Sequence, residues 1–191
     1  MVSAIVFIAN GTEEMEFTIV VDVLRRANVK VQVVGVELGH VGYAECSRGV
    51  KIVPDSALEA SSLNDWADYD LAVIPGGLKG AETLRDNTTV KQILSSFYDK
   101  QKHVAFICAG TIAAKAANIG QGRKATSYPA FKEELSNYYD YSEDRVVVDG
   151  NLVTSRGPGT AFLFALTLVS NLVGKEVSSK LEKEMLTATT L

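Results

Sequence analysis

Short, uninterrupted apolar runs alternate with helix-like segments along almost the whole chain. The strand-like runs occupy residues 3–9, 30–36, 69–77 and 103–107. Continuous apolar strands of this kind occur in parallel sheets that helices cover on both faces. The alternation therefore predicts an α/β fold: a flavodoxin-like, doubly wound and mostly parallel sheet with helices on both faces, formed by one domain that spans residues 1–191.

Spacing, turn residues and caps predict the other elements. In a helix expected over 13–28, Met15 and Ile19 recur at helical spacing with Val23 and Leu24, and they define a stripe that faces the core. Further helices are expected over 89–101, 109–120, 130–137, 157–174 and 177–186, with Gly120 as a C-cap. Hairpins are expected from Val41–Glu45 with Val50–Val53 and over 144–155, and a glycine-rich loop is expected after the strand at 69–77.

Composition excludes several classes of protein. The chain has 191 residues, a net charge of -4 and a pI near 5.3, so no basic surface for nucleic acid or an anionic membrane is expected. No run approaches the roughly 20 apolar residues of a membrane span. The two cysteines, Cys46 and Cys108, do not form a C-x-x-C motif, so we expect no thiolate metal site and a reducing, cytoplasmic location.

The expected fold places a site at the carboxyl ends of the strands, where open α/β sheets bind ligands. Three polar or glycine-rich loops leave such ends, at 10–16, 75–80 and 108–110. These loops bring together a carboxylate, open backbone N–H groups and a thiol. A site with a nucleophile and an acid is therefore expected at this edge.

Cys108 is the candidate nucleophile, because it lies between a buried strand and the start of a helix. Such a turn resembles a nucleophile elbow, which exposes the side chain. The free N–H groups and partial positive charge at a helix N-terminus predict a lowered thiol pKa. Cys46 is interpreted as a small buried hydrophobe, the usual role of a free cysteine.

Carboxylates and glycines around Cys108 supply the other candidate groups. Glu13 and Glu14 are interpreted as a solvated acidic first turn, whereas Glu16 falls near the inward stripe. A carboxyl buried beside the thiol would have a raised pKa and could donate a proton. Gly76 and Gly77 form either a tight turn or, with the N–H of Ala109, an oxyanion site.

Histidine is scarce, and this limits how Cys108 can be activated. His103 begins the strand that ends at Cys108, about 16 Å away, and His40 lies in the hairpin region. No G-x-S-x-G, H-E-x-x-H or G-x-G-x-x-G motif is present, and the segment GGLKGAE lacks the ending of a P-loop. A Cys–His protease, a serine hydrolase, a zincin and a standard dinucleotide site are therefore not expected.

Five segments resemble the DJ-one/PfpI superfamily, in matching order across nearly the whole chain. They are similar to its parkinsonism-associated deglycase branch: NGTEEMEFTIVVDVLRRANVKV, ECSRGVKIVPD, DLAVIPGG, AFICAGT and TSRGPGTAFLFAL. The resemblance implies a flavodoxin-like homodimer in the cytoplasm and also the nucleus. It implies a nucleophile at Cys108, a protonated acid at Glu16 and backbone donors at Gly77 and Ala109. It also implies a pocket arginine at Arg48, with Arg26 approaching from a dimer partner.

Two positions depart from the superfamily pattern. Ala109 follows the cysteine, where protease-like members carry histidine, so peptidase activity is not expected. Tyr128 precedes Pro129, where close relatives carry a pocket histidine. A tyrosine can hydrogen-bond but cannot serve as a neutral base near pH 7, and this places the proton transfers on Glu16.

The resemblance implies a cofactor-independent, glyoxalase III-type lyase of the D-lactate dehydratase class. It would convert methylglyoxal or glyoxal, small dicarbonyls, into 2-hydroxy acids without glutathione, through a hemithioacetal on Cys108 and with Glu16 as acid and base. It also implies protein deglycase activity. A redox sensor or chaperone-like dimer that uses oxidation of Cys108 is the alternative, since a reactive thiol is also open to oxidation. A flavin-binding electron carrier rests on the fold alone.

Overall fold

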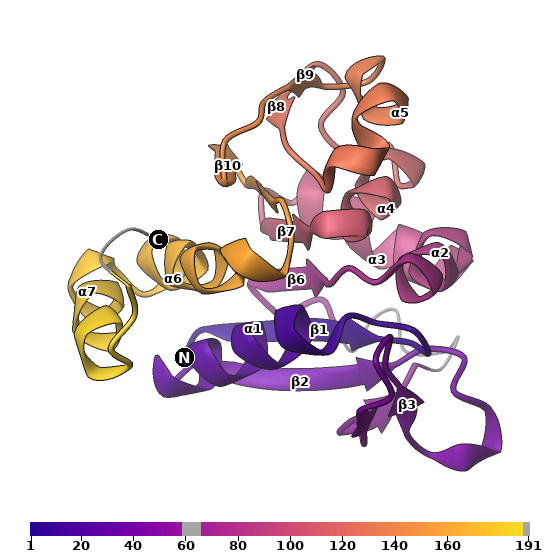
Figure 1. Cartoon of the computed structure of the whole chain (residues 1–191), viewed down its shortest axis with the longest axis horizontal. Coiled ribbons are helices and arrows are strands. Elements are labelled where there is room, and N and C mark those ends of the chain that lie inside the picture. Colours follow the sequence, from indigo (N-terminus) through magenta and orange to yellow (C-terminus); the bar gives the residue numbers. More distant parts are fainter. Residues whose placement is uncertain (59–65, 189–191) are drawn as a thin grey trace.

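The computed structural model describes residues 1–58 and 66–188, and in this part of the chain a central sheet of seven strands carries the fold. The strand order is β10-β11-β7-β6-β1-β2-β5 (Figure 1). All neighbouring pairs are parallel except β10 with β11. The strands are β1 (Ser3–Ile8), β2 (Lys30–Gly35), β5 (Ser56–Ala57), β6 (Leu71–Ile74), β7 (His103–Ile107), β10 (Val146–Asp149) and β11 (Leu152–Ser155).

The order of the principal parallel strands confirms the predicted fold class. Counted along the chain, β1, β2, β6, β7 and β11 are arranged 2-1-3-4-5, which is the order of flavodoxin-like sheets. The direction of winding reverses between β1 and β6. The loops that leave these two strands therefore diverge, and they leave a crevice at the carboxyl ends of the strands.

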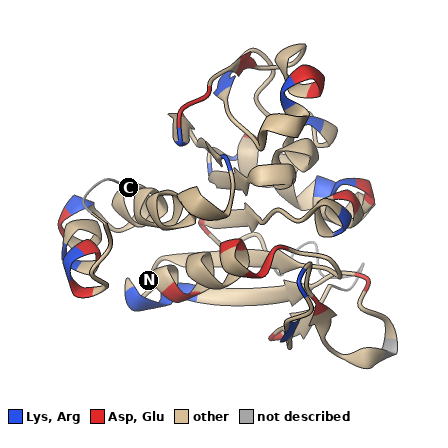
Figure 2. Cartoon of the chain, viewed as in Figure 1, with Lys and Arg blue, Asp and Glu red and all other residues tan. Residues whose placement is uncertain are grey.

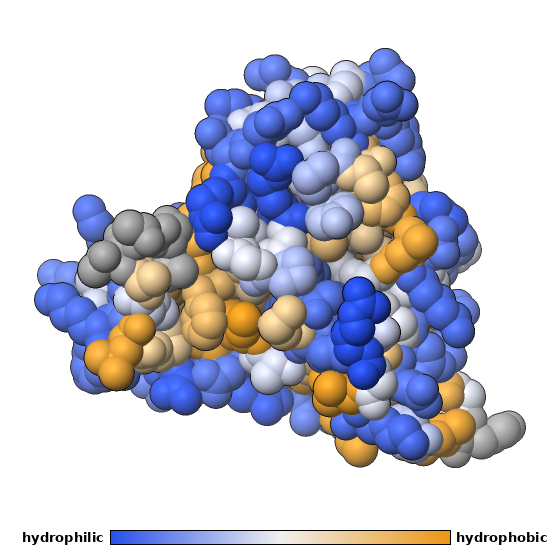
Figure 3. All heavy atoms as spheres, viewed as in Figure 1, coloured by the Kyte–Doolittle hydropathy of each residue, from blue (hydrophilic) through white to orange (hydrophobic). Residues whose placement is uncertain are grey.

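Helices cover both faces of the sheet, as expected. They are α1 (Glu14–Arg26), α2 (Leu78–Asp86), α3 (Thr88–Asp99), α4 (Thr111–Ala116), α5 (Lys132–Ser136), α6 (Ala161–Leu172) and α7 (Lys175–Glu184). One apolar core includes residues of α1, α6 and α7, and the other includes residues of α3, α4 and α5. Apolar side chains of α1 and α6 remain visible where these helices meet (Figure 3).

Charged residues lie mainly on helices and loops, and the central strands carry few of them (Figure 2). Both signs are mixed on α2 and α7 in this view. Within residues 1–58 and 66–188, no helix combines the length and the apolar character that crossing a bilayer requires.

The expected loop over 75–80 is wrong from residue 78 onward, because α2 begins directly after Gly77. Gly80 lies in the first turn of this helix, and a Cβ at this position would lie 2.7 Å from the backbone nitrogen of Thr12. The glycine permits close packing of α2 against the loop after β1. This helix was not predicted, because Gly76, Gly77 and Gly80 were interpreted as residues of one loop.

The helix after Cys108 is also shorter than expected. Residues Cys108–Gly110 form a 3-10 turn, and α4 ends at Ala116. Asn118 has a φ of 56°, and the N–H of Ile119 bonds to the carbonyl of Ala114. This left-handed residue ends the helix, so the prediction of Gly120 as the C-cap is wrong.

Both expected hairpins form, with short strands. β3 (Ala44–Glu45) pairs with β4 (Lys51–Ile52), and β10 pairs with β11 across Gly150. A further small sheet of β8 (Lys124–Ala125) and β9 (Asp140–Tyr141) was not predicted, because two-residue strands have no periodicity to detect.

Candidate functional site

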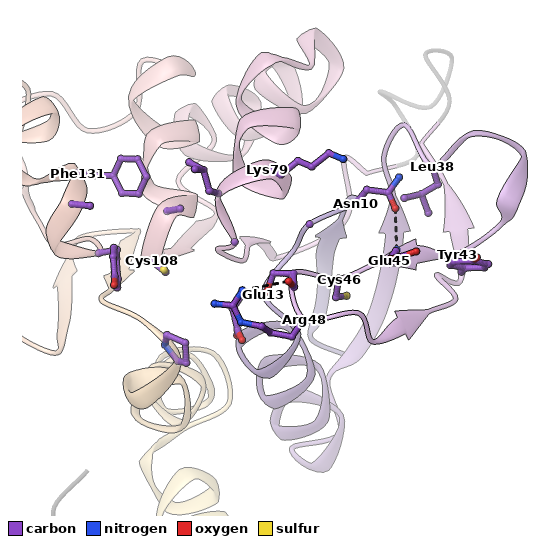
Figure 4. A pocket seen from close by; sticks show the side chains of 18 of the residues that line it. Asn10, Glu13, Leu38, Tyr43, Glu45, Cys46, Arg48, Lys79, Cys108 and Phe131 are labelled. Carbon is purple, nitrogen blue, oxygen red and sulfur yellow. Dashed lines mark hydrogen bonds between the residues drawn. The ribbon is translucent and has the colours of Figure 1, made fainter.

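A cleft of about 950 Å³ opens at the carboxyl ends of β1, β6 and β7 (Figure 4). It includes the crevice beside the reversal point of the sheet, where this fold class binds ligands. Its lining contains both cysteines and a mixture of apolar and charged side chains. The lining residues are Asn10, Gly11, Glu13, Leu38, Val41, Tyr43, Glu45, Cys46, Ser47, Arg48, Gly77, Leu78, Lys79, Cys108, Ala109, Tyr128, Ala130, Phe131 and Pro158.

Cys108 occupies a strained turn at the base of the cleft. It directly follows β7, and its φ of 62° is unusual for a residue that is not glycine. Gly110 lets this turn pack against β6, since a Cβ there would lie 2.6 Å from the carbonyl oxygen of Ile74. The turn has the form of a nucleophile elbow, and it leaves Cys108 8% exposed to the cleft.

Glu16 lies fully buried in the first turn of α1, beside Cys108. Its Oε2 accepts a hydrogen bond of 2.8 Å from the N–H of Gly76. Its Oε1 is also buried and has no nitrogen or oxygen partner in the described part of the chain. Burial raises the pKa of Glu16 to about 7, against the opposing effects of the Gly76 N–H and the Cys108 thiol.

The prediction of a lowered pKa for Cys108 is wrong in direction. Burial raises the pKa of the Cys108 thiol, and the nearby Glu16 carboxylate raises it further. The N–H groups of Ala109 and Gly77 bond to the sulfur and oppose this rise. The six-residue α4 has a weak dipole, and burial outweighs it. Cys108 and Glu16 therefore act as one coupled pair.

Close contacts around Cys108 and Glu16 require glycine at positions 76 and 77. A Cβ on Gly76 would lie 2.4 Å from Oε2 of Glu16 and 2.6 Å from the Cβ of Cys108. Gly77 has a φ of 84°, and a Cβ there would lie 2.2 Å from the carbonyl oxygen of Gly11. The N–H of Gly76 is bonded to Glu16, whereas Gly77 and Ala109 direct their N–H groups at the sulfur.

The interpretation of Glu13 and Glu14 as a solvated acidic turn is wrong for Glu14. Glu13 caps α1 by accepting a hydrogen bond from the N–H of Glu16. Glu14 is buried, and its carboxylate accepts hydrogen bonds from the Ser47 hydroxyl and the Arg48 N–H, both 2.8 Å long. Burial alone would raise the pKa of Glu14, but these bonds and its own backbone N–H lower it overall. Ser47 and Arg48 are distant from Glu14 in sequence, so a local pattern cannot show these bonds, which hold the Glu14 side chain in the interior.

The predicted core-facing stripe of α1 was wrong at Met15. Met15 is 54% exposed, whereas Val23 and Leu24 are fully buried. The buried face of α1 passes through Glu16, Phe17, Val20, Val21, Val23 and Leu24. Glu16 therefore belongs to the core face of α1 itself.

The remaining expected residues divide into two groups. Arg48 and Tyr128 line the cleft with Cys108, and both are exposed. Arg26 pairs with Asp22 at the opposite end of α1, about 15 Å along the helix from Glu16. It cannot reach this cleft within its own chain, so its approach from a dimer partner stays a prediction. His103 begins β7, at the end of the strand away from Cys108.

Cys46 is buried, as expected, and its environment differs from that of Cys108. Burial raises the pKa of Cys46 to about 11, and the Glu14 and Glu13 carboxylates contribute. Within residues 1–58 and 66–188, no group of three His, Cys, Asp or Glu side chains is arranged to hold a metal ion. Lys79, in the first turn of α2, and Phe131, in the turn Pro129–Phe131, also line the cleft.

Comparison with known proteins agrees with this geometry. The model of the DJ-1/PfpI family matches residues 2–171. Protein DJ-1alpha of Drosophila melanogaster is 44% identical over 185 residues, covering 96% of this chain and 83% of that protein. A protein of Schizosaccharomyces pombe named glutathione-independent glyoxalase DJ-1 is 35% identical over 189 residues, covering 97% of this chain and 98% of that protein.

Solved structures are similar over the same extent. The crystal structure of Drosophila melanogaster DJ-1beta superposes with a TM-score of 0.90 and 42% identity, and the match covers 98% of each chain. Fold and sequence thus agree across nearly the whole length. The chain belongs to the DJ-1/PfpI family.

Proposed function

We propose that the protein is a glutathione-independent glyoxalase of the D-lactate dehydratase class. Its substrates would be methylglyoxal and glyoxal, and its products the corresponding 2-hydroxy acids. One observation carries the proposal: the carboxyl of Glu16, with a pKa of about 7, is buried against the Cys108 thiol at the base of an open cleft. The name of the Schizosaccharomyces pombe relative supports the same reaction.

The first step forms a carbon–sulfur bond. Glu16 takes the thiol proton, and the Cys108 sulfur adds to the aldehyde carbon. The N–H groups of Gly77 and Ala109, which bond to the sulfur in the free protein, favour its anionic form. These groups lie next to the developing alkoxide and stabilise it. The alkoxide then takes the proton from Glu16, which leaves a hemithioacetal and a carboxylate.

The second step moves hydrogen between the two substrate carbons. The Glu16 carboxylate removes the proton from the former aldehyde carbon, and the electron pair moves toward the ketone oxygen to form an enediolate. The proton of the neighbouring hydroxyl passes to the former ketone oxygen, Glu16 returns its proton to the adjacent carbon, and a thioester of the 2-hydroxy acid results. A pKa near 7 suits both directions of this transfer, because the carboxyl gives and accepts a proton with similar ease.

Hydrolysis of the thioester completes the reaction. Water adds to the thioester carbonyl, the 2-hydroxy acid leaves, and Cys108 regains its proton. The sum of the steps is the addition of one water to methylglyoxal, without a net change of oxidation state. Arg48 lines the cleft and would orient the carbonyl oxygens of the substrate.

The experiment compares the two cysteines in an assay that contains no glutathione. The wild-type protein should consume methylglyoxal and form lactate, and Cys108→Ser should abolish lactate formation. Cys46→Ser is the matched control and should retain turnover, because the acid–base group Glu16 pairs with the Cys108 thiol and not with Cys46. Lactate formation by Cys108→Ser at the wild-type rate would disprove the covalent route.

Protein deglycase activity follows from the same chemistry under this proposal. Free dicarbonyl that dissociates from a reversible adduct would be consumed at Cys108, and the adduct would decline by mass action. Protein deglycase activity would therefore need no second site.

Oxidation of Cys108 is a second candidate function, favoured by the N–H groups of Gly77 and Ala109 at its sulfur. A sulfinate would accept hydrogen bonds from both and from protonated Glu16. Mild peroxide should yield sulfinate at Cys108 before any oxidation of Cys46, as measured by peptide mass spectrometry. Equal oxidation at the two cysteines would contradict this function.

A further inference from the structure

The cleft is much larger than the substrates considered above. Methylglyoxal has five non-hydrogen atoms, whereas the cleft of about 950 Å³ lies near the upper limit for sites that hold drug-sized ligands, about 300–1,000 Å³. Cys108 and Glu16 need contact only with the two carbonyl carbons. The cleft of a single chain therefore has room for a substituent on the ketone carbon.

Tyr128 is held rigidly beside the nucleophile. Its N–H bonds to the carbonyl of Cys108, and its own carbonyl accepts from the N–H of Phe131 and the hydroxyl of Ser127. A Cβ added to Gly157 would lie 3.7 Å from a ring carbon of Tyr128, so one part of the ring rests against this glycine. Tyr128 is nevertheless 46% exposed.

The cleft surface next to Tyr128 is also apolar. Ala130 and Phe131 follow it in the same turn, and both line the cleft. The Phe131 ring lies on the Cys108 side of the cleft, across from Arg48 and Glu13 (Figure 4). The wall near Cys108 is thus aromatic and apolar, while the opposite wall mixes charged Arg48 and Glu13 with apolar side chains such as Leu38. Such a cleft suits a substrate with one apolar and one polar end.

We propose that the protein prefers 2-oxoaldehydes that carry an aryl group, and that Tyr128 is the residue that determines this specificity. This inference rests on the proposed glyoxalase function. The dicarbonyl would lie at Cys108 and Glu16, and the aryl ring would stack against the exposed face of Tyr128. Phenylglyoxal would then undergo the same hydrogen shift and hydration, and the product would be mandelate.

The test measures kcat/KM for phenylglyoxal and for methylglyoxal with wild-type protein and variants. The ratio of the two values is compared between variants, because the intrinsic reactivity of each aldehyde then cancels. Tyr128→Ala should lower the phenylglyoxal-to-methylglyoxal ratio by about tenfold, the size expected for a lost aromatic contact and its buried area. Tyr128→Phe should keep the ratio within about twofold, because the ring remains.

Phe162→Ala is the control outside the cleft. Phe162 lies on α6, is 37% exposed and is not among the described residues that line the cleft. It should leave the ratio unchanged, and thermal unfolding should show that every variant is folded. A wild-type ratio below one, or an equal loss for both substrates in Tyr128→Ala, would overturn the inference and leave the proposed function intact. Absence of Cys108-dependent turnover of either aldehyde would overturn both.

Discussion

Replacing Glu16 by glutamine should lower kcat for methylglyoxal by about 100- to 10,000-fold, the usual contribution of a positioned acid–base group. Glutamine has the shape of the carboxyl, and its amide oxygen can still accept the hydrogen bond that the Gly76 N–H donates to Oε2. The side chain at Oε1 becomes an amide NH2, which cannot shuttle a proton. Steady-state lactate formation measures the loss, and KM should change much less than kcat.

The same Glu16→Gln change should stabilise the protein at neutral pH. The pKa of Glu16 is raised from 4.5 in a free chain to about 7 by burial, so the folded state holds a proton that the unfolded state releases. Stability contributed by this proton is present below pH 4.5 and is lost as the pH rises toward 7. The free energy of unfolding of Glu16→Gln minus that of wild type should therefore be about 3 kcal/mol larger at pH 7 than at pH 4.

Denaturant unfolding of both proteins at several pH values measures this difference. Glu14→Gln is the matched control on the same helical turn, and its pH dependence should have the opposite sign. The pKa of Glu14 is lowered, so its stabilising effect is present above its free-chain pKa and is lost as the pH falls. A pH-independent difference between wild type and Glu16→Gln would show that the carboxyl titrates normally.

Replacing Gly76 by alanine should disrupt the pair of Cys108 and Glu16. The added Cβ would lie 2.4 Å from Oε2 of Glu16 and 3.0 Å from Sγ of Cys108, and both side chains would have to move. Overpacking of this kind costs about 1–3 kcal/mol in stability. Displacement of catalytic groups by about 1 Å can cost about 100-fold in rate, so we expect a comparable loss of kcat.

Gly159→Ala controls for the substitution itself. A Cβ on Gly159 meets no atom within 4 Å. This variant should retain both stability and turnover, as measured by the same unfolding and lactate assays. Wild-type turnover in Gly76→Ala would mean that the close contact is not needed for the reaction.

Much of the fold was predictable because it depends on local pattern. Uninterrupted apolar runs such as 103–107 have few structural alternatives, and their alternation with helices implies a parallel sheet. The position of Cys108 at a strand end followed directly from that alternation. Its nearness to Glu16 followed as well, since the carboxyl ends of parallel strands share one edge.

The electrostatics of the site could not be predicted in the same way. The pKa of Cys108 depends on burial and on Glu16, which is distant in sequence. Glu14 is buried because Ser47 and Arg48 bond to it from a hairpin more than thirty residues away. Gly80 was assigned to a loop for a related reason: the close packing of α2 against Thr12, which accounts for a glycine within this helix, is a tertiary contact. These properties arise from tertiary contacts.

Three side chains in the first turn of α1 have separate structural or catalytic roles. Glu13 caps the helix, Glu14 fastens the hairpin that carries Arg48, and Glu16 pairs with Cys108. Because one turn of backbone carries all three, a small rotation of α1 would shift the cleft wall and the proton donor together. Substitutions in the distant core where α1 packs on α6 should therefore alter turnover without touching the cleft.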